Sequence, residues 1–155
     1  MMRYPHCLVM SAGDRSLKEV IDLEQFVYVR NDLRVRGEIK LFILQMIAAL
    51  DHMHGKGYIH GDVKPKNILR MGDGSFVLID LDACAIINKD LSAMKYSSAY
   101  LPPELIGVSA TSGEAFVKSP AVDEARRSED VVLAAEAHDI WALGIHLCLH
   151  FSKSS

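Results

Sequence analysis

Four polar residues that could perform chemistry together lie in the stretch HGDVKPKN, from His60 to Asn67. Asp62 supplies a carboxylate that can accept a proton, and Lys64 supplies a cation that can steady an anion. Asn67 adds an amide oxygen, which is a ligand for hard cations such as Mg²⁺. Proton acceptance, anion neutralisation and cation binding are the roles that phosphoryl transfer requires. The stretch therefore indicates a site for chemistry on phosphate.

The elements on either side of this stretch must position it. Before it, apolar residues recur at helical spacing from Ile39 to Met53, and Gly55 can cap the C-terminus of that helix. Earlier still, Ser16 and Glu19 have the spacing of a capping box, which predicts a short helix. After it, NILRMGDGSFVLIDLD reads as two short strands around a GDG turn.

The remaining segments are less regular. HCLVM predicts a strand that ends at the turn SAGD. Residues 80–104 show no clear period, and the two prolines of YLPPEL prevent a helix from continuing. Residues 107–127 are rich in Ser, Ala, Glu and Asp, which predicts a mobile surface loop. HDIWALGIHLCLHF is apolar nearly all round, which predicts a helix buried in the centre of a domain.

Composition restricts the class of protein. The 155 residues fit one domain, and a hydrophobic share of 50% with 24% charged residues describes a globular protein. Seventeen basic against 20 acidic residues leave no strongly basic face, so nucleic acid is not expected as a partner. The three cysteines are widely spaced, which favours a reducing compartment such as the cytoplasm or nucleus. The sequence shows no signal-peptide pattern and no apolar stretch long enough to span a membrane, so a membrane is not expected as a partner.

Four motifs follow one another in a recognisable order, namely HGDVKPKN, DLD, YLPPE and DIWALG. They resemble the catalytic loop, the magnesium motif, the end of the activation segment and the central helix of the protein kinase family. The resemblance extends from about Tyr4 to Phe151. It implies an α+β fold, mostly α, in the form of a kinase-like C-terminal lobe with short β-hairpins at the catalytic cleft.

The resemblance also divides the chain, residues 1–155, as one partial kinase domain. The parts are a strand and hinge (5–15), a helical region (16–55), the catalytic loop (58–69), the activation segment (80–104), an insertion (107–137) and the central helix (138–151). The sequence contains no G-x-G-x-x-G and no V-A-I-K lysine. The chain is therefore expected to represent the hinge and most of the C-terminal lobe, without the N-terminal lobe.

Functional roles follow from the resemblance residue by residue. Asp62 matches the catalytic base, Lys64 the lysine that neutralises the γ-phosphate, and Ser97 a hydroxyl that bonds to both. Asn67 and Asp80 match the two magnesium ligands. The implied cofactors are ATP and Mg²⁺, and the implied partner is a protein substrate with a serine or threonine.

Further positions are implied around the nucleotide. Met10 matches the gatekeeper, Ala12 offers backbone contacts to adenine, and Leu69 forms the floor of the adenine site. Asp139 matches the aspartate that holds the catalytic loop's backbone from below. Uncovered apolar surface, left by the missing lobe and closing helices, is expected to bind a docking partner or cause self-association.

Several of these residues also have a purely structural interpretation. Asp62 could simply cap a turn. His60 reads as a packed structural residue, and Met10 as first of all a core methionine. Trp141 reads as a core anchor. His146 and His150 have metal-ligand spacing, but with no third ligand nearby core packing is favoured. The acidic run from Asp123 to Asp130 reads as a solvated face.

Departures from the family pattern leave three hypotheses open. Gly61 replaces an arginine that in many kinases pairs with a phosphorylated loop. Asp82 replaces a glycine of the magnesium motif, and this change either strengthens the metal site or stiffens the backbone. In the first hypothesis the chain is a partial serine/threonine kinase that is weakly active or inactive by itself. In the second it is a pseudokinase-like binding module, and in the third it is a truncated product that folds poorly. The four retained residues Asp62, Lys64, Asn67 and Asp80 favour the kinase.

Overall fold

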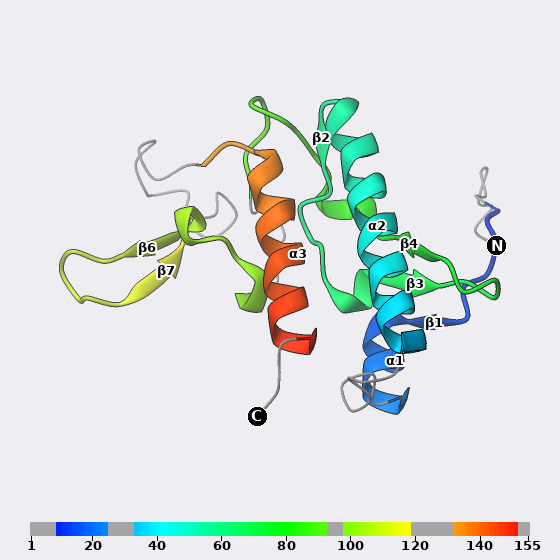
Figure 1. Cartoon of the computed structure of the whole chain (residues 1–155). Coiled ribbons are helices and arrows are strands. Elements are labelled where there is room, and N and C mark those ends of the chain that lie inside the picture. Colours follow the sequence, from blue (N-terminus) through cyan, green and yellow to red (C-terminus); the bar gives the residue numbers. More distant parts are fainter. Residues whose placement is uncertain (1–8, 25–32, 93–97, 119–131, 152–155) are drawn as a thin grey trace, which may run out of the picture.

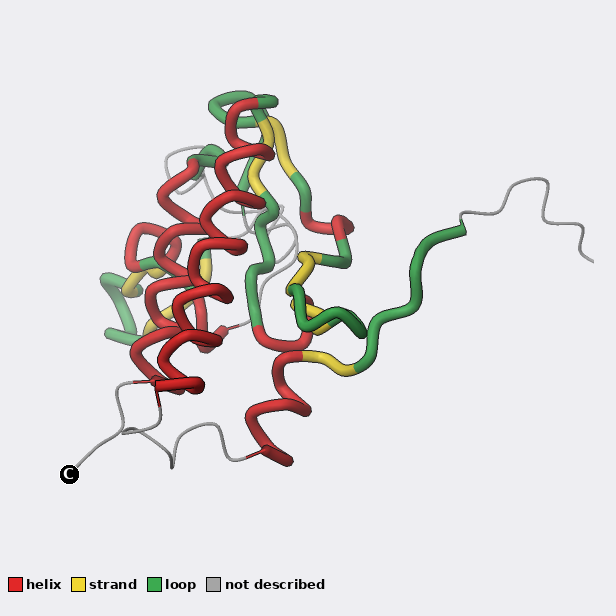
Figure 2. The backbone as a smooth tube through the Cα atoms, turned by 45° about the vertical axis from the view of Figure 1, so that its right-hand side comes forward, coloured by secondary structure: helices red, strands yellow, loops and turns green. Residues whose placement is uncertain are grey.

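The computed structural model describes residues 9–24, 33–92, 98–118 and 132–151. Three α-helices and several short antiparallel strand pairs make up this part of the chain (Figure 1). The fold class is therefore α+β, as predicted. The two longer helices, α2 and α3, stand side by side, and the segment that carries the catalytic loop passes between the helices and the small sheet (Figures 1 and 2).

Helix α1 (Leu17–Glu24) begins with the predicted capping box. The N–H of Ser16 donates to Glu19 Oε2 at 2.8 Å, and the N–H of Glu19 donates to Ser16 Oγ at 3.3 Å. These two bonds satisfy backbone donors that the first turn would leave unpaired. Leu17 and Val20 then point into the core.

Helix α2 (Leu33–Gly55) is the element predicted from the apolar spacing. Phe42, Met46 and Leu50 are buried and form one wall of the main core. Its opposite face carries Leu41, Leu44 and Ile47, which are about half exposed. The helix therefore buries one apolar stripe and presents a second one to solvent.

A three-stranded antiparallel sheet lies against α2, in the order β1 (Arg15–Ser16), β3 (Ile68–Arg70) and β4 (Phe76–Leu78). The hairpin β3–β4 is the one predicted around GDG, and Gly74 takes a φ of 84° in its turn. Phe76 packs edge-to-face on Phe42, with ring centroids 5.1 Å apart. This contact fixes the hairpin, and the loop before it, on the helix.

The strand predicted at HCLVM is wrong for its described part. Val9 and Met10 have no strand partner among the described residues, and the rest of that stretch lies outside them. Figure 2 shows this segment as a loop that runs away from the body of the molecule. Met10 is 72% exposed, so its interpretation as a core methionine is also wrong. The chain joins the sheet only at β1, where Ser16 pairs with Leu69.

Strands β2 (Tyr58–Ile59) and β5 (Ala85–Ile86) form a second antiparallel pair on either side of the catalytic loop and the hairpin. Beyond β5, the backbone of residues 88–92 bonds to residues 132–134, including Ser92 N to Val132 O at 2.8 Å. Short 3-10 turns at Pro65–Asn67, Leu81–Ala83, Ser98–Tyr100 and Pro103–Leu105 complete this region. No period marks such pairings in the sequence, because each strand has only two residues.

Strands β6 (Ile106–Val108) and β7 (Ala115–Val117) form a hairpin where a mobile loop was predicted. Gly107 makes the pairing possible, because the ring of Phe116 lies across it so closely that a Cβ would overlap the ring. The loop prediction is therefore wrong for residues 107–108 and 115–117, whereas residues 109–114 form the turn between the two strands. Residues 119–127 of the predicted loop and the whole acidic run from Asp123 to Asp130 lie outside the described residues.

Helix α3 (Glu136–Phe151) has a buried side and an exposed side. Ala142, Leu143 and His146 are buried, and the His146 ring meets Phe42 of α2 with centroids 5.9 Å apart. Trp141 is 41% exposed, so its interpretation as a core anchor is wrong. The prediction of a helix buried all round is wrong for the same reason: the other described elements cover only one side of it.

Packing of His146 is confirmed by its complete burial, whereas the side chain of His150 lies outside the described residues. Within the described ranges, no helix is long and apolar enough to cross a membrane.

Candidate active site

Asp139, in the first turn of α3, organises the catalytic loop from below. Its side chain is 1% exposed. Oδ2 accepts the N–H of His60 at 2.8 Å, and Oδ1 accepts the N–H of Gly61 at 2.9 Å. A third bond joins Oδ2 to Nε2 of His54, near the end of α2, at 2.9 Å. The role that the resemblance assigned to Asp139 is thus present, and His54 is a partner that sequence reasoning missed.

Gly61 adopts a backbone conformation that other residues rarely take. Its φ is 79°, and a Cβ at this position would collide with the backbone oxygen of Ala83. Glycine alone relieves both the left-handed strain and the contact. The segment after Asp80 lies so close to the catalytic loop that position 61 has no room for the side chain of an arginine.

His60 is a structural residue, as expected. It is fully buried, and its Nδ1 accepts the N–H of Asp62 at 3.3 Å. With Nδ1 as an acceptor, the proton of the neutral ring lies on Nε2, which then donates to the carbonyl oxygen of Ile79 at 3.0 Å. The ring thus connects the loop to the residue that precedes Asp80.

The three chemical groups of the loop converge on the carboxylate of Asp62. Lys64 Nζ lies 2.5 Å from Asp62 Oδ2, and Asn67 Nδ2 donates to the same oxygen at 3.1 Å and to the Asp62 carbonyl at 2.9 Å. Two donors on one carboxylate oxygen fix the direction of the Asp62 side chain. The arrangement suits a base that must point in a fixed direction.

Asp80 is brought close to Asn67 by the hairpin. The N–H of Ile79 donates to the Asn67 carbonyl at 2.9 Å, so the ends of the two strands lie together. Asp80 itself is exposed and takes a left-handed conformation with φ 66°. Both Asn67 side-chain bonds use Nδ2, and in the described structure its Oδ1 makes none. An amide oxygen and a carboxylate are the ligand types that Mg²⁺ takes beside nucleotide phosphates, so the donor set fits that ion.

Asp82 occupies the glycine position of the magnesium motif without backbone strain. It lies in the 3-10 turn Leu81–Ala83 and is exposed. Among the described non-glycine residues only Asp80 and Asn88 have positive φ, so position 82 does not demand glycine here.

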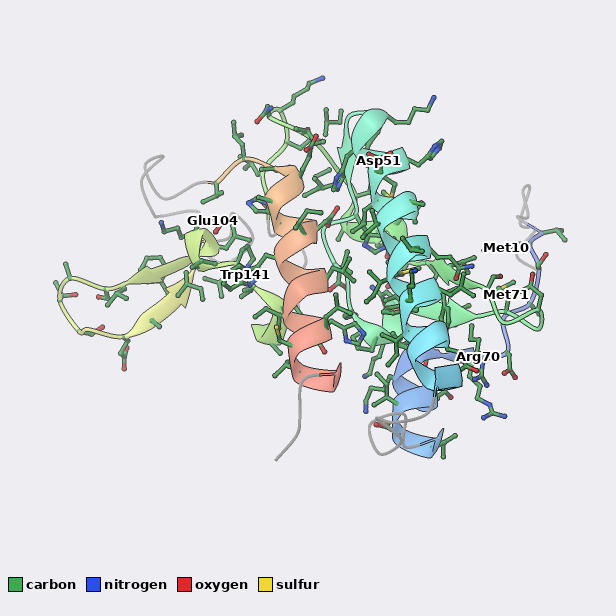
Figure 3. The ribbon with its side chains drawn as sticks, in the orientation of Figure 1. Met10, Asp51, Arg70, Met71, Glu104 and Trp141 are labelled. Atoms are coloured by element: carbon green, nitrogen blue, oxygen red, sulfur yellow. The ribbon has the colours of Figure 1, made fainter. Side chains whose placement is uncertain are left out.

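The predicted nucleotide contacts are only partly brought together. Leu69 lies on β3 and packs against Gly13, where a Cβ would come within 2.7 Å of Leu69 Cδ1. Gly13 thus lets the segment before β1 approach the predicted adenine floor. Met10 and Ala12 are both exposed in that segment, and Met10 lies at the edge of the molecule in Figure 3. Ser97 lies outside the described residues.

Comparison with known proteins identifies the family. A family model for the protein kinase domain matches residues 5–154. The chain belongs to the protein kinase family.

Three relatives illustrate the similarity of this kinase chain to known proteins. Maternal embryonic leucine zipper kinase of Danio rerio is 32% identical over 129 residues, which are 80% of this chain and 16% of that protein. Serine/threonine-protein kinase PSK2 of Saccharomyces cerevisiae is 28% identical over 128 residues (82% and 10%). Calcium/calmodulin-dependent protein kinase kinase cmkC of Emericella nidulans is 26% identical over 151 residues (94% and 24%). The chain thus spans a quarter or less of each relative's length.

The end of the activation segment has a partner in this kinase chain that sequence reasoning missed. His138 Nε2 lies 3.4 Å from Glu104 Oε1, and His138 Nδ1 is 2.8 Å from Ser92 Oγ. Burial lowers the pKa of His138, and the charges of Glu104 and Asp139 partly oppose that effect. His138 therefore links residues 92 and 104 to the start of α3. Only its position beside Asp139 marks it in the sequence, and that gives no hint of these contacts.

Proposed function

We propose that this chain takes part in the transfer of the γ-phosphoryl group of ATP to a serine or threonine hydroxyl of a protein substrate. The observation that carries this proposal is the convergence of Lys64 and Asn67 on the carboxylate of Asp62, with Asp80 at the adjoining end of the hairpin. These residues supply the base, the cation and the metal ligands that the reaction needs.

The chain's own residues divide the work of the reaction. Asp62 accepts or orients the proton of the attacking hydroxyl, and the bonds from Asn67 hold it in place for that role. Lys64 is close enough to share its charge between Asp62 and an incoming phosphate. Asn67 and Asp80 would hold Mg²⁺, which neutralises charge on the phosphate oxygens when bound.

Nucleotide binding by this polypeptide alone should be weak. The sequence contains no glycine-rich loop and no V-A-I-K lysine, which in kinases cover ATP and position its phosphates. We expect a dissociation constant for Mg-ATP in the millimolar range, about −4 kcal/mol. Calorimetry would measure it, and micromolar affinity of the chain alone would contradict this expectation.

Serine/threonine rather than tyrosine specificity is supported by Lys64, which stands two residues after Asp62 as in that branch of the family. A pure binding module is a weaker proposal, because it has no physical need for all four of Asp62, Lys64, Asn67 and Asp80.

The test is phosphate transfer from labelled ATP to matched peptides that differ only in carrying Ser, Thr or Tyr. It uses the longest natural polypeptide that contains this chain. Labelling of Ser or Thr is the expected result. Labelling of Tyr alone, or of none of the peptides, would contradict the proposal.

A further inference from the structure

The hairpin β6–β7 has an outer edge that no other described element covers. It is a two-stranded sheet of its own, and it projects away from α3 in Figure 1. β7 is therefore an edge strand, with one side paired to β6 and the other side open among the described residues. Such an edge presents backbone donors and acceptors that form a template for a further strand.

The hydrogen-bond pattern of the hairpin shows which backbone groups lie on the open side of β7. The N–H of Lys118 donates to the carbonyl oxygen of Leu105 at 2.8 Å, toward β6. In an antiparallel pair this direction alternates along the strand, so Phe116 also faces β6. The N–H and C=O groups of Ala115 and Val117 point the other way, and no other described residue bonds to them.

A second copy of β7 fits this open edge in the antiparallel direction. When Phe116 lies opposite its own copy on a two-fold axis, Ala115 of each chain lies opposite Val117 of the other. Because both residues direct their backbone groups outward, each such pair exchanges two hydrogen bonds. The two hairpins then form one four-stranded sheet, which is more stable than an isolated two-stranded hairpin.

The charges at the two ends of β7 match in this arrangement. Glu114 precedes the strand and Lys118 follows it, and both side chains share a face of the hairpin with Phe116. In the two-fold pairing Glu114 of one copy lies directly opposite Lys118 of the other, and the axis repeats this pair at the other end. Opposite charges in cross-strand positions attract and like charges repel. A parallel pairing in register would place each charge opposite its own copy, so the pattern selects the antiparallel arrangement.

The other face of the hairpin is apolar. Ile106 and Val108 of β6 are 43% and 66% exposed, and they share this face with Ala115 and Val117 of β7. Pairing of two copies brings the Ala115 and Val117 side chains of both chains together. This contact stabilises the association, because apolar surface leaves water.

We propose that the chain forms a two-fold symmetric dimer in which the β7 strands of two copies pair edge to edge. The interface is independent of phosphoryl transfer, because it uses none of the residues assigned to that reaction. The paired segment, residues 114–118, is too short to bury the roughly 1,000 Å² of a stable interface. The dimer is therefore reversible and forms at high protein concentration.

The test reverses the charges at the ends of β7. Glu114→Lys and Lys118→Glu are made separately and together. Each single variant places like charges opposite each other at both ends of the pairing, whereas the double variant restores opposite charges. A one-to-one mixture of the single variants restores them too, because one chain then carries only basic residues at the two positions and its partner only acidic ones.

Two controls accompany these variants. All chains carry Ile140→Lys and Leu149→Lys, which replace exposed apolar residues of α3 and so suppress association through that helix. Asp51→Lys is the matched control for Glu114→Lys, because it changes the net charge equally at an exposed position of α2 (Figure 3).

Two measurements report on the dimer. Sedimentation velocity over a range of protein concentrations gives its dissociation constant. Amide hydrogen exchange at low and high concentration gives its location, because the amides of Ala115 and Val117 should exchange more slowly as the dimer forms.

Each single variant should raise the dissociation constant at least about 4-fold, the lower limit for turning two cross-strand ion pairs into like-charge pairs. The double variant and the mixture should return it to the value of the parent chain, and Asp51→Lys should leave it nearly unchanged. Four outcomes would overturn the proposal: a parent chain that stays monomeric, single variants that associate as tightly as the parent, a mixture that associates no better than its components, and Ala115 and Val117 amides whose exchange does not depend on concentration.

Discussion

The Oδ1 atom of Asp139 accepts a hydrogen bond from the backbone N–H of Gly61, 2.9 Å away and 78 residues earlier in the chain. This bond holds Gly61 in a left-handed conformation directly before Asp62. The direction of the proposed base is therefore set by a buried carboxylate on α3 and by a residue that has no side chain.

Gly61→Ala should destabilise the fold through two effects. An alanine at φ 79° is strained by about 1–2 kcal/mol, and its Cβ would also collide with the backbone of Ala83. Gly57→Ala is the matched control, because Gly57 has φ 83° but open space around it. Urea unfolding of both variants separates the effects. Equal losses of stability would contradict the close approach at Ala83.

Asp139→Asn should destabilise the fold by about 1–3 kcal/mol, the cost of leaving a buried donor without its acceptor. An amide group in this position retains one oxygen for the two N–H groups of His60 and Gly61 and for His54. Asp51→Asn, at an exposed position of α2, should change stability by no more than about 0.5 kcal/mol. Urea denaturation of the two variants checks this, and equal stabilities would contradict the anchoring role of Asp139.

The sequence predicted well the elements whose signal is local. Three features are determined by residues close together in the sequence, and each is present in the structure. They are the capping box of Ser16 and Glu19, the apolar stripe of α2 and the GDG turn. The ordered motifs likewise pointed to Asp62, Lys64 and Asn67, whose side chains lie together, and to Asp139, which holds the loop. The functional roles of the predicted site residues stay predictions, for Asp62, Lys64, Asn67 and Asp80 as well as for Ser97, Met10, Ala12 and Leu69.

Features that depend on distant partners were not predictable in this way. The exposed side of α3 depends on which elements cover it, and an apolar sequence cannot tell a buried side from a bare one. The hairpin β6–β7 depends on Phe116 lying across Gly107. The contacts of His54 with Asp139 and of His138 with Ser92 join residues 85 and 46 positions apart. No spacing rule connects such pairs.

Acid should weaken the fold partly through His138. Burial places its pKa below the ordinary value of 6.5, so on acidification the unfolded chain takes up this proton first. The stability that neutral His138 supplies is thus complete above about pH 7 and declines as the pH falls through about 6.5. The difference in unfolding free energy between wild type and His138→Gln isolates this effect. It should shrink on acidification, and growth of the difference would contradict the assignment.

The apolar residues Ile140, Trp141 and Leu149 leave α3 with exposed hydrophobic surface (Figure 3). We expect the isolated chain to self-associate or to bind a hydrophobic dye. Ile140→Lys combined with Leu149→Lys should reduce both effects, whereas Glu136→Gln on the same helix should not. Sedimentation velocity checks this, and a wild-type chain that remains monomeric without dye binding would count against it.

The proposed roles of Asp62 as the base and of Asp80 as a metal ligand are tested most directly by comparing their asparagine variants. The variants are made in the longest natural polypeptide that contains the chain. Single-turnover phosphate transfer and Mg-ATP affinity are measured for each. Asp62→Asn removes the base and should lower the transfer rate about 10²–10⁴-fold with nearly unchanged Mg-ATP affinity. Asp80→Asn removes a charged metal ligand and should lower both the rate and the Mg-dependent affinity. Full activity of the Asp62→Asn protein would contradict the account and make the loop a structural feature only.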